Sequence, residues 1–532
     1  MVQETLLYVI SLLFAVMLLV ILGQKLRIAY PVFLVIGGLL ISLIPAAPHP
    51  AISPDLIFLI FLPPLLYEAA WYTSWPSFWK MRWPIGLHGF GLVIVTSIVV
   101  AFLSEKLIPR FTLSIGLLLG GIISPPDAVA ASSVLKLFKI PKNVKTILEG
   151  ESLVNDASSL TVFRFAVAAV ISGTFVLHKA ALSFVFVTVM GIAIGLVIGQ
   201  IIFYIHKLFS TTTSIATALT LITPYIMYLT AEHFHSSGVL AVVSGGLFLS
   251  SRSRDILNYK ARLQSTGVWH TLAFILNGLI FILIGLQLPH IVNGLKYYTV
   301  SEGIRYGLII SGIIIVIRLI WVFGATYILL LFDKKLRSEG MKSNPREIFL
   351  IGWAGMRGVV SLASALAIPV TLADGNEFPE RDLVLFISFV VILVTLVLQG
   401  LTLPWVIKKL KLTEDKRTIP ADIQTQQIHL MLIKLALEQI DKKYSELVQS
   451  NILVYNMKQK FENELGYTRA NIDSMKTALD EKQQVLEYNR VQLDIGDLLH
   501  RHLTQMQTQD LFDEDVIRAE EAKVDLEQNK IT

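Results

Sequence analysis

The sequence contains no cysteine among its 532 residues, and only 16% of the residues are charged. The absence of cysteine excludes disulfides, thiol catalysis and cysteine-ligated metal sites. Soluble globular proteins carry roughly 25% charged residues, whereas this chain is 54% hydrophobic, so we predict an integral membrane protein. The net charge of +5 is expected for basic loops beside a membrane and does not indicate nucleic-acid binding.

Long apolar segments dominate the first 410 residues. A membrane-spanning helix needs about 20 mostly apolar residues. The first segment lacks a basic stretch before it and an Ala-x-Ala cleavage motif, so we expect a retained span and not a signal peptide. We predict thirteen spans, at residues 4–23, 30–45, 54–72, 84–104, 111–135, 144–172, 177–205, 212–231, 236–250, 267–288, 304–332, 346–370 and 382–407.

Basic residues are divided unequally between alternate loops. One set of loops holds 18 lysines and arginines and the opposite set holds 6. Because the basic loops of membrane proteins face the cytoplasm, we expect the N-terminus outside and the C-terminus in the cytoplasm. This orientation requires an odd number of spans, which agrees with thirteen.

The composition changes after the last span. Residues 420–525 are polar and charged and contain almost no glycine or proline, and an apolar stripe at helical spacing begins at residues 428–437. We therefore divide the chain into a membrane domain, residues 1–410, and a cytoplasmic helical tail, residues 411–532. The tail is expected to serve either dimerisation and stability or regulation.

Three carboxylates interrupt the predicted sixth span, at Glu149, Glu151 and Asp156. An ionised group inside a bilayer costs at least ~2.5–3.5 kcal/mol. Ser152 shares one helical stripe with Glu149 and Asp156, and Asn155 shares the adjacent stripe with Glu151. Such oxygens suit a hard cation, and a carboxylate also carries a proton; the alternative is that the acids pair with buried bases. For Asp156 beside Asn155 we favour the functional interpretation.

Two other predicted spans contain breaks. In the fifth, Pro125 and Pro126 remove two backbone donors just before Asp127, so the helix is expected to stop and restart there. In the twelfth, residues 352–361 contain three glycines and Arg357. Irregular backbone at membrane depth is tolerated only where it is buried in protein or lines a cavity, and a buried Arg357 is expected to need a carboxylate partner.

Further charges lie within other spans. Glu68 in the third span and Arg318 in the eleventh are expected to form a structural ion pair. Arg164 lies two helical turns beyond Asp156 on a similar face, where it could reach an interface. None of four histidines is assigned a role, because isolated histidines near span ends are more often surface groups: His88, His233, His235 and His270.

Corresponding interruptions indicate an internal repeat. The broken fifth and twelfth spans are seven spans apart, as are the third and tenth, where the tenth carries Asn277 and Gly278. Two six-span units joined by one linker span account for thirteen, and an offset of seven inverts the second unit. Inverted repeats with broken helices near the midplane are typical of secondary transporters. The predicted fold is thus an all-α polytopic membrane protein with two broken, crossing helices.

At these motifs the chain resembles the monovalent cation:proton antiporter-1 family, the sodium/proton exchangers of bacteria and eukaryotes. The resemblance extends over roughly residues 5–410, and one departure is Pro126, where many members carry threonine before the aspartate. The segments that carry it are residues 61–70, 121–133, 148–158, 273–289 and 352–365.

The resemblance implies the identity of the site. Asp156 is the shared ion and proton site, with Asn155, Ser152, Glu151 and Asp127 around it, and Na+ meets Asp156, Ser152 and Asp127. It also implies two ion pairs, Glu151 with Arg357 and Glu68 with Arg318. From its position toward the cytoplasmic end of the span, we expect Glu149 only to guide ions to the site. A homodimer, a mobile core subdomain beside a dimer subdomain, and elevator-like alternating access are implied as well.

The expected function is electroneutral one-for-one exchange of Na+ or Li+ for H+ across the cell membrane, coupled by competition at Asp156. Exchange of K+ by the same mechanism is the alternative. A cation channel is disfavoured by the inverted repeat and the single-carboxylate site. An intramembrane hydrolase is disfavoured because no histidine is credibly placed within a span, which leaves only Asp127 with Asp156 as a weak candidate dyad. We thus expect no enzymatic activity and no cofactor, with cations, protons, membrane lipid and a second copy of the chain as partners.

Overall fold

The computed structural model separates the chain into two compact units, Met1–Glu414 and Asp415–Thr532. Part of the predicted tail, and a loop at 333–343 that holds four of the counted basic residues, lie outside the described residues. The residues that the structure describes are 2–26, 29–44, 57–138, 140–173, 177–209, 212–295, 297–332, 344–372, 375–412, 421–474 and a few positions between 490 and 524.

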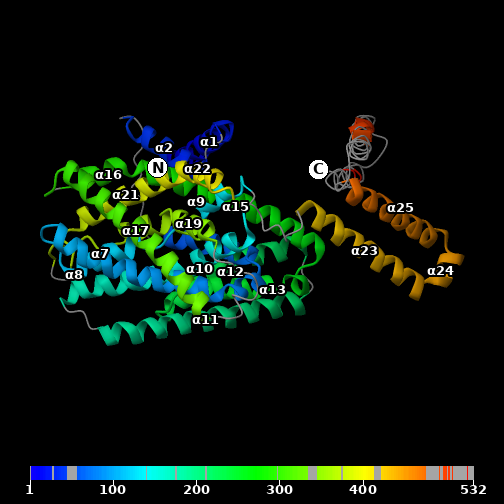
Figure 1. Ribbon diagram of the computed structural model, residues 1–532, viewed down its shortest axis with the longest axis horizontal. Coiled ribbons are helices and arrows are strands. Elements are labelled where there is room, and N and C mark those ends of the chain that lie inside the picture. The colour runs from blue at the N-terminus through cyan, green and yellow to red at the C-terminus, as the bar shows by residue number, and fades with distance from the viewer. Residues whose placement is uncertain are drawn as a thin grey trace. The chain divides into compact units, whose positions relative to one another are not determined.

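The described part of the first unit is built from helices, and Figure 1 shows them packed side by side, with the long α11 along one edge. The helices of this unit are α1 (Val2–Leu26), α2 (Tyr30–Ser42), the π-helical turn η1 (Ile57–Phe61), α4 (Leu62–Tyr72), α5 (Trp75–Lys80), α6 (Arg82–Gly86), η2 (Leu87–Leu92), α7 (Val93–Leu107), α8 (Leu113–Ile123), α9 (Ala128–Leu135), α10 (Lys142–Ser172), α11 (Leu177–Leu208), α12 (Thr213–His233), α13 (Gly238–Ser251), α14 (Ser253–Ile256), α15 (Tyr259–Leu286), α16 (Leu288–Gly294), α17 (Val300–Phe332), α19 (Pro345–Trp353), α20 (Val359–Leu366), α21 (Arg381–Val394), η3 (Thr395–Gln399) and α22 (Gly400–Leu410).

Many of these helices are apolar enough to cross a membrane. Within the described residues, nine are both long and apolar enough, and three shorter apolar helices accompany them. The chain is therefore a multi-pass membrane protein, while the count of thirteen spans stays a prediction. The tenth span was expected at 267–288, but α15 begins two turns earlier because Asn258 caps it: its Oδ1 accepts a hydrogen bond from Ala261 N at 2.8 Å.

Two helices are interrupted, as the proline and glycine motifs predicted. The first break separates α8 from α9, and the second separates α19 from α20. The two breaks touch each other, since the backbone N–H of Asp127 donates a hydrogen bond to the carbonyl of Met356 at 2.6 Å. Each broken helix therefore supplies one of the backbone partners that the other lost.

α2 and α15 cross with their backbones close together. A Cβ atom at Gly38 would lie 2.3 Å from the carbonyl oxygen of Ile282, and one at Gly285 would lie 2.4 Å from that of Val35. No side chain fits between the two backbones at this crossing. Both glycines are therefore required by the close approach of the helices.

Buried apolar side chains form two clusters. The smaller cluster contains residues of α4, α11, α12, α13 and α15, together with Leu153 and Ala157 of α10. The larger cluster includes residues of α7, α8, α9, α19, α20 and α21, and it also contains Val154 and Phe163 of α10. α10 therefore packs on both clusters, with different faces.

The described part of the second unit is helical as well, with α23 (Ala421–Lys443), α24 (Ser445–Ser450) and α25 (Ile452–Ser474). α23 and α25 pack against each other as a hairpin. An ion pair and a hydrogen bond join them: Lys458 Nζ lies 2.7 Å from Asp441 Oδ1, and His429 Nε2 lies 3.1 Å from Glu464 Oε1. The hydrogen bond to Asp441 raises the pKa of Lys458 above its ordinary value.

Candidate ion-exchange site

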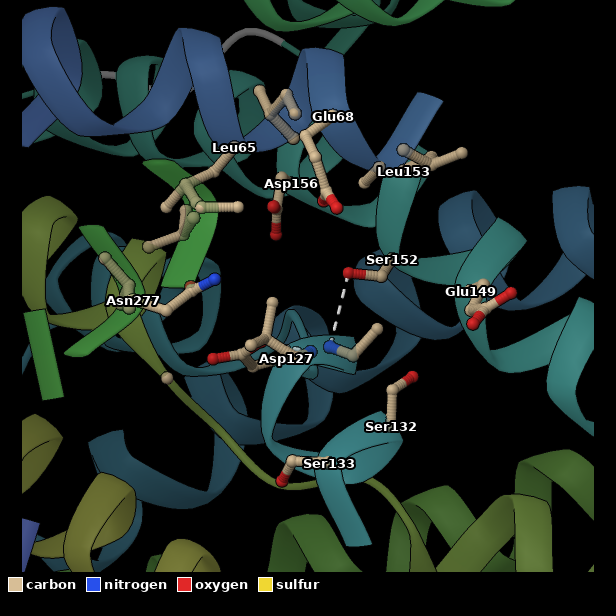
Figure 2. A pocket seen from close by; sticks show the side chains of 18 of the residues that line it. Leu65, Glu68, Asp127, Ser132, Ser133, Glu149, Ser152, Leu153, Asp156 and Asn277 are labelled. Carbon is tan, nitrogen blue, oxygen red and sulfur yellow. Dashed lines mark hydrogen bonds between the residues drawn. The ribbon is translucent and has the colours of Figure 1, made fainter. Parts of the chain in front are cut away.

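A cavity of about 550 Å³ lies where the two broken helices meet. One wall is formed by α2, α4 and α15, and the other by the α8–α9 break, α10 and α20. Figure 2 shows the carboxyl groups of Asp156 and Glu68 pointing into the cavity, with Ser152 and Asn277 on different sides of it. Asp127 lines the same cavity from the broken helix.

α10 is tied to the first break by two side chains. The Nδ2 of Asn155 donates a hydrogen bond to the carbonyl of Pro126 at 2.9 Å, and the Oγ of Ser152 accepts one from the N–H of Ala128 at 3.3 Å. Asn155 is fully buried, and its Oδ1 has no partner among the described residues. These bonds hold Asp156, which follows Asn155 directly, beside the break.

Asp127 stands at the start of a half-helix, as the sequence predicted. Its Oδ1 accepts a hydrogen bond from the N–H of Val129 at 2.8 Å and thereby caps α9. Its Oδ2 faces the start of α20, because a Cβ at Gly358 would lie 1.8 Å from this oxygen. The positive ends of two half-helices therefore meet at one carboxylate.

Arg357 does not pair with Glu151, so this expectation was wrong. Its guanidinium is fully buried and donates to the carbonyls of Ile123 at 2.9 Å, Ser124 at 3.4 Å and Gly355. The break in α8 frees such carbonyls, and the negative end of a helix dipole favours a cation. Carbonyls at a helix end thus replace the carboxylate partner that the sequence analysis required.

Glu151 instead pairs with Arg318. The two side chains are each 1% exposed, and the carboxylate accepts from Nη1 at 2.6 Å and from Nη2 at 3.1 Å. Arg318 also donates to the carbonyls of Gly352 and Ile351, both at 3.2 Å, at the end of α19. Both broken helices therefore have a buried arginine at the C-terminal end of their first half, and Glu151 lies outside the cavity lining.

Glu68 is consequently free of the predicted pair with Arg318, and this expectation was also wrong. Glu68 lines the cavity from α4, and its Oε1 lies 3.9 Å from Nδ1 of His270. The ring of His270 is stacked on Tyr72, with 4.8 Å between centroids. The separation along the chain gave no signal of which acid would meet which arginine.

The structure brings together most of the predicted site residues. Asp156, Ser152 and Asp127 line one cavity, and Asn155 supports it from behind. Glu149 lies farther out in the cavity, where its Oε1 is 3.8 Å from Nζ of Lys145. The sequence analysis missed several lining residues; the isolated amide of Asn277 was noted only as a helix interruption, and no pattern distinguished the others: Tyr30, Lys136, His270 and Ser361.

The arrangement has a definite chemical capacity. Carboxylate, hydroxyl and carbonyl oxygens are ligands for hard cations, and a carboxylate that binds a cation also binds a proton. Broken helices that meet at a cavity between two groups of spanning helices define the class of secondary transporters.

Comparison with known proteins places the chain within this class. The family model described as "Sodium/hydrogen exchanger, transmembrane" matches residues 10–409, and the chain belongs to this family. A protein of Bacillus pumilus named as a sodium, potassium, lithium and rubidium/H+ antiporter is 34% identical over 77% of this chain and 62% of its own length. The chain thus spans less than two thirds of that relative.

Other similarities cover more of the matched proteins. An uncharacterised Na+/H+ exchanger of Mycobacterium bovis is 31% identical over 98% of this chain and 95% of its own length. The low-affinity Na+/H+ antiporter NhaS1 of Synechocystis is 33% identical over 78% and 76%. The structure of the sodium proton antiporter MjNhaP1 of Methanocaldococcus jannaschii superposes on 77% of this chain and 99% of its own chain. The TM-score is 0.61 at 18% sequence identity, which confirms the fold.

Proposed function

We propose that this chain exchanges Na+ or Li+ for H+ across the membrane, with Asp156 as the carrier of both. The observation that carries the proposal is the difference between the two cavity aspartates. Asp127 caps α9 through its Oδ1 atom, whereas neither carboxylate oxygen of Asp156, which lines the cavity, has a hydrogen bond among the described residues. A cation and a proton compete for this carboxylate, and the competition couples their fluxes.

The same difference supports one-for-one, electroneutral exchange. Asn155 occupies the position where a second acid would add a titratable charge, and it is engaged by the carbonyl of Pro126. The N-terminal ends of α9 and α20 favour the ionised form of Asp127 whether Asp156 binds a cation or a proton. One carboxylate then binds either one monovalent cation or one proton, so the carrier has the same charge in both loaded states.

Transport further requires access from both sides of the membrane. We propose that the wall containing α9, α10 and α20 moves against the wall containing α2, α4 and α15. The 18-to-6 distribution of basic residues supports an outside N-terminus and a cytoplasmic C-terminus in the cell membrane. A homodimer in contact with lipid, a role in pH homeostasis, and function without a cofactor or enzymatic activity complete the proposal.

Potassium is the second candidate substrate at the same site. The observation that favours it is the similarity to the Bacillus pumilus protein, which is named as an antiporter of sodium, potassium, lithium and rubidium. A channel is disfavoured, because the described cavity lies between two walls of one chain, whereas a channel needs a continuous pore.

Proteoliposomes loaded with a pH-sensitive dye test the proposal. Addition of Na+ is expected to dissipate an imposed proton gradient, and Asp156→Asn is expected to abolish this response because an amide cannot exchange a proton. Asp255→Asn, an exposed position on α14, serves as the matched control. Full exchange by Asp156→Asn would refute the proposal.

Two further arms of the same assay resolve the remaining choices. Replacing Na+ by K+ tests the second substrate. A potassium-selective ionophore clamps the membrane voltage, and the rate is expected to stay unchanged if the exchange is electroneutral; a faster rate would indicate that net charge moves.

A further inference from the structure

The two walls of the cavity also meet beyond Asp156, along α10. Leu153, Ala157 and Leu160 follow one another at helical spacing and pack on the smaller apolar cluster, which is formed by α4, α11, α12, α13 and α15. Arg164 continues this stripe one turn beyond Leu160. The cavity therefore lies on one side of Asp156, and a packed seam between the walls lies on the other.

An ion pair stands at the end of this seam. The Nη2 atom of Arg164 lies 2.8 Å from Oε1 and 2.7 Å from Oε2 of Glu232, which is on α12. Glu232 also accepts a hydrogen bond from the N–H of Gly238 at 3.3 Å, at the start of α13. Arg164 is eight residues beyond Asp156, which corresponds to about 12 Å along the helix.

The pair joins elements that belong to different walls. α10 packs mostly on α8 and its neighbours and less on α4 and α13, whereas α12 packs on α4, α13 and α15. The buried pair of Glu151 and Arg318 differs in this respect, because it joins α10 to α17 and to the end of α19 in the larger cluster. Arg164 and Glu232 are therefore placed to hold the walls together on the side where the cavity is closed.

We propose that Arg164 and Glu232 form the gate that closes the ion pathway on the side of Asp156 opposite the cavity, and that the pair separates when that side opens. The proposal rests on the proposed alternating access. The two side chains are 46% and 29% exposed, and a partly exposed ion pair contributes little free energy. Such a pair can break in each transport cycle, which a fully buried pair could not do readily.

Cross-linking tests the gate in a chain that has no other cysteine. Arg164→Cys and Glu232→Cys are combined, and a short, reducible bifunctional thiol reagent links the two positions. Na+/H+ exchange in proteoliposomes is expected to fall at least tenfold after linking and to return when a reductant cleaves the link. The two single-cysteine variants are treated with the same reagent, which modifies their one thiol but cannot form the link. They show whether modification alone lowers the exchange rate.

A matched link controls for cross-linking as such. Asp441→Cys with Lys458→Cys replaces an ion pair between two helices of the second unit, and linking it is expected to leave the exchange rate unchanged. If the unlinked Arg164/Glu232 double variant exchanges ions but the link has no effect, the gate is refuted while the proposed function stands. If the unsubstituted protein fails to exchange, the proposed function fails instead.

A labelling experiment reads the opening of the seam directly. Leu160→Cys places a thiol midway between Asp156 and Arg164, and a membrane-impermeant thiol reagent is added on the side opposite the cavity. Adding Glu232→Gln is expected to raise the labelling rate roughly two- to fivefold, as loss of a partly exposed ion pair allows. An unchanged rate would show that the pair does not hold the seam closed.

Discussion

The buried pair of Glu151 and Arg318 permits a quantitative prediction, because its partners differ in what else they contact. Arg318 also donates to the carbonyls of Gly352 and Ile351, whereas in the described structure the carboxylate of Glu151 bonds only to Arg318. Removing one partner of a buried pair costs about 3–5 kcal/mol. The two single substitutions should therefore fall at different ends of this range.

Glu151→Gln leaves a buried guanidinium that retains two carbonyl acceptors, so we expect a loss of about 3 kcal/mol in stability. Arg318→Met leaves a buried carboxylate without a bond and exposes two carbonyls at the end of α19, so we expect about 5 kcal/mol. The double variant, Glu151→Met with Arg318→Met, removes both charges and leaves only the carbonyls unpaired. It should lose about 2 kcal/mol, less than either single variant.

The assay is the thermal midpoint of the full-length protein in detergent, followed by the loss of the monodisperse peak in size-exclusion chromatography. The expected order of stability is wild type, double variant, Glu151→Gln and Arg318→Met. If the double variant were less stable than both single variants, the two residues would not form the coupled pair. Equal losses for the single variants would contradict the role of Arg318 at the end of α19.

Two further predictions concern the cavity. Glu68→Gln should leave the thermal midpoint nearly unchanged but raise the Na+ concentration for half-maximal exchange, because this acid faces the cavity and is not in a buried ion pair. A large fall in the thermal midpoint would instead show that Glu68 stabilises the fold. Gly358→Ala should reduce exchange at least tenfold, since the added Cβ would lie 1.8 Å from Oδ2 of Asp127. The control Gly312→Ala should exchange normally, because the space around Gly312 is open. Equal rates for the two glycine variants would show that the break around Asp127 tolerates displacement.

The breaks in the helices were predictable from the sequence, because their causes are local. Pro125 and Pro126 lack backbone donors wherever they stand, so α8 had to end before them. The placement of Asp127 as a cap followed from the same motif. The stripe of Ser152 and Asp156 likewise followed from helical spacing alone.

The choice of ion-pair partners could not be predicted in the same way. Glu151 lies 167 positions from Arg318, and spacing along the chain does not determine which of two buried arginines it meets. A buried arginine also does not always need a carboxylate, since the carbonyls of Ile123 and Ser124 accept hydrogen bonds from Arg357. The local break in α8 frees these carbonyls, but they reach Arg357 only because the breaks in two distant helices come together.

The backbone contact between Gly38 and Gly285 has a mechanical consequence. Relative sliding of two helices normally occurs through changes in side-chain rotamers, and at this crossing no side chain lies between α2 and α15 to supply them. The two helices should therefore move together as one rigid unit, and α10 should move relative to that unit. Spin labels on α2 and α15 should keep one narrow distance distribution whichever ion is supplied, while the distance from either label to α10 should take two values.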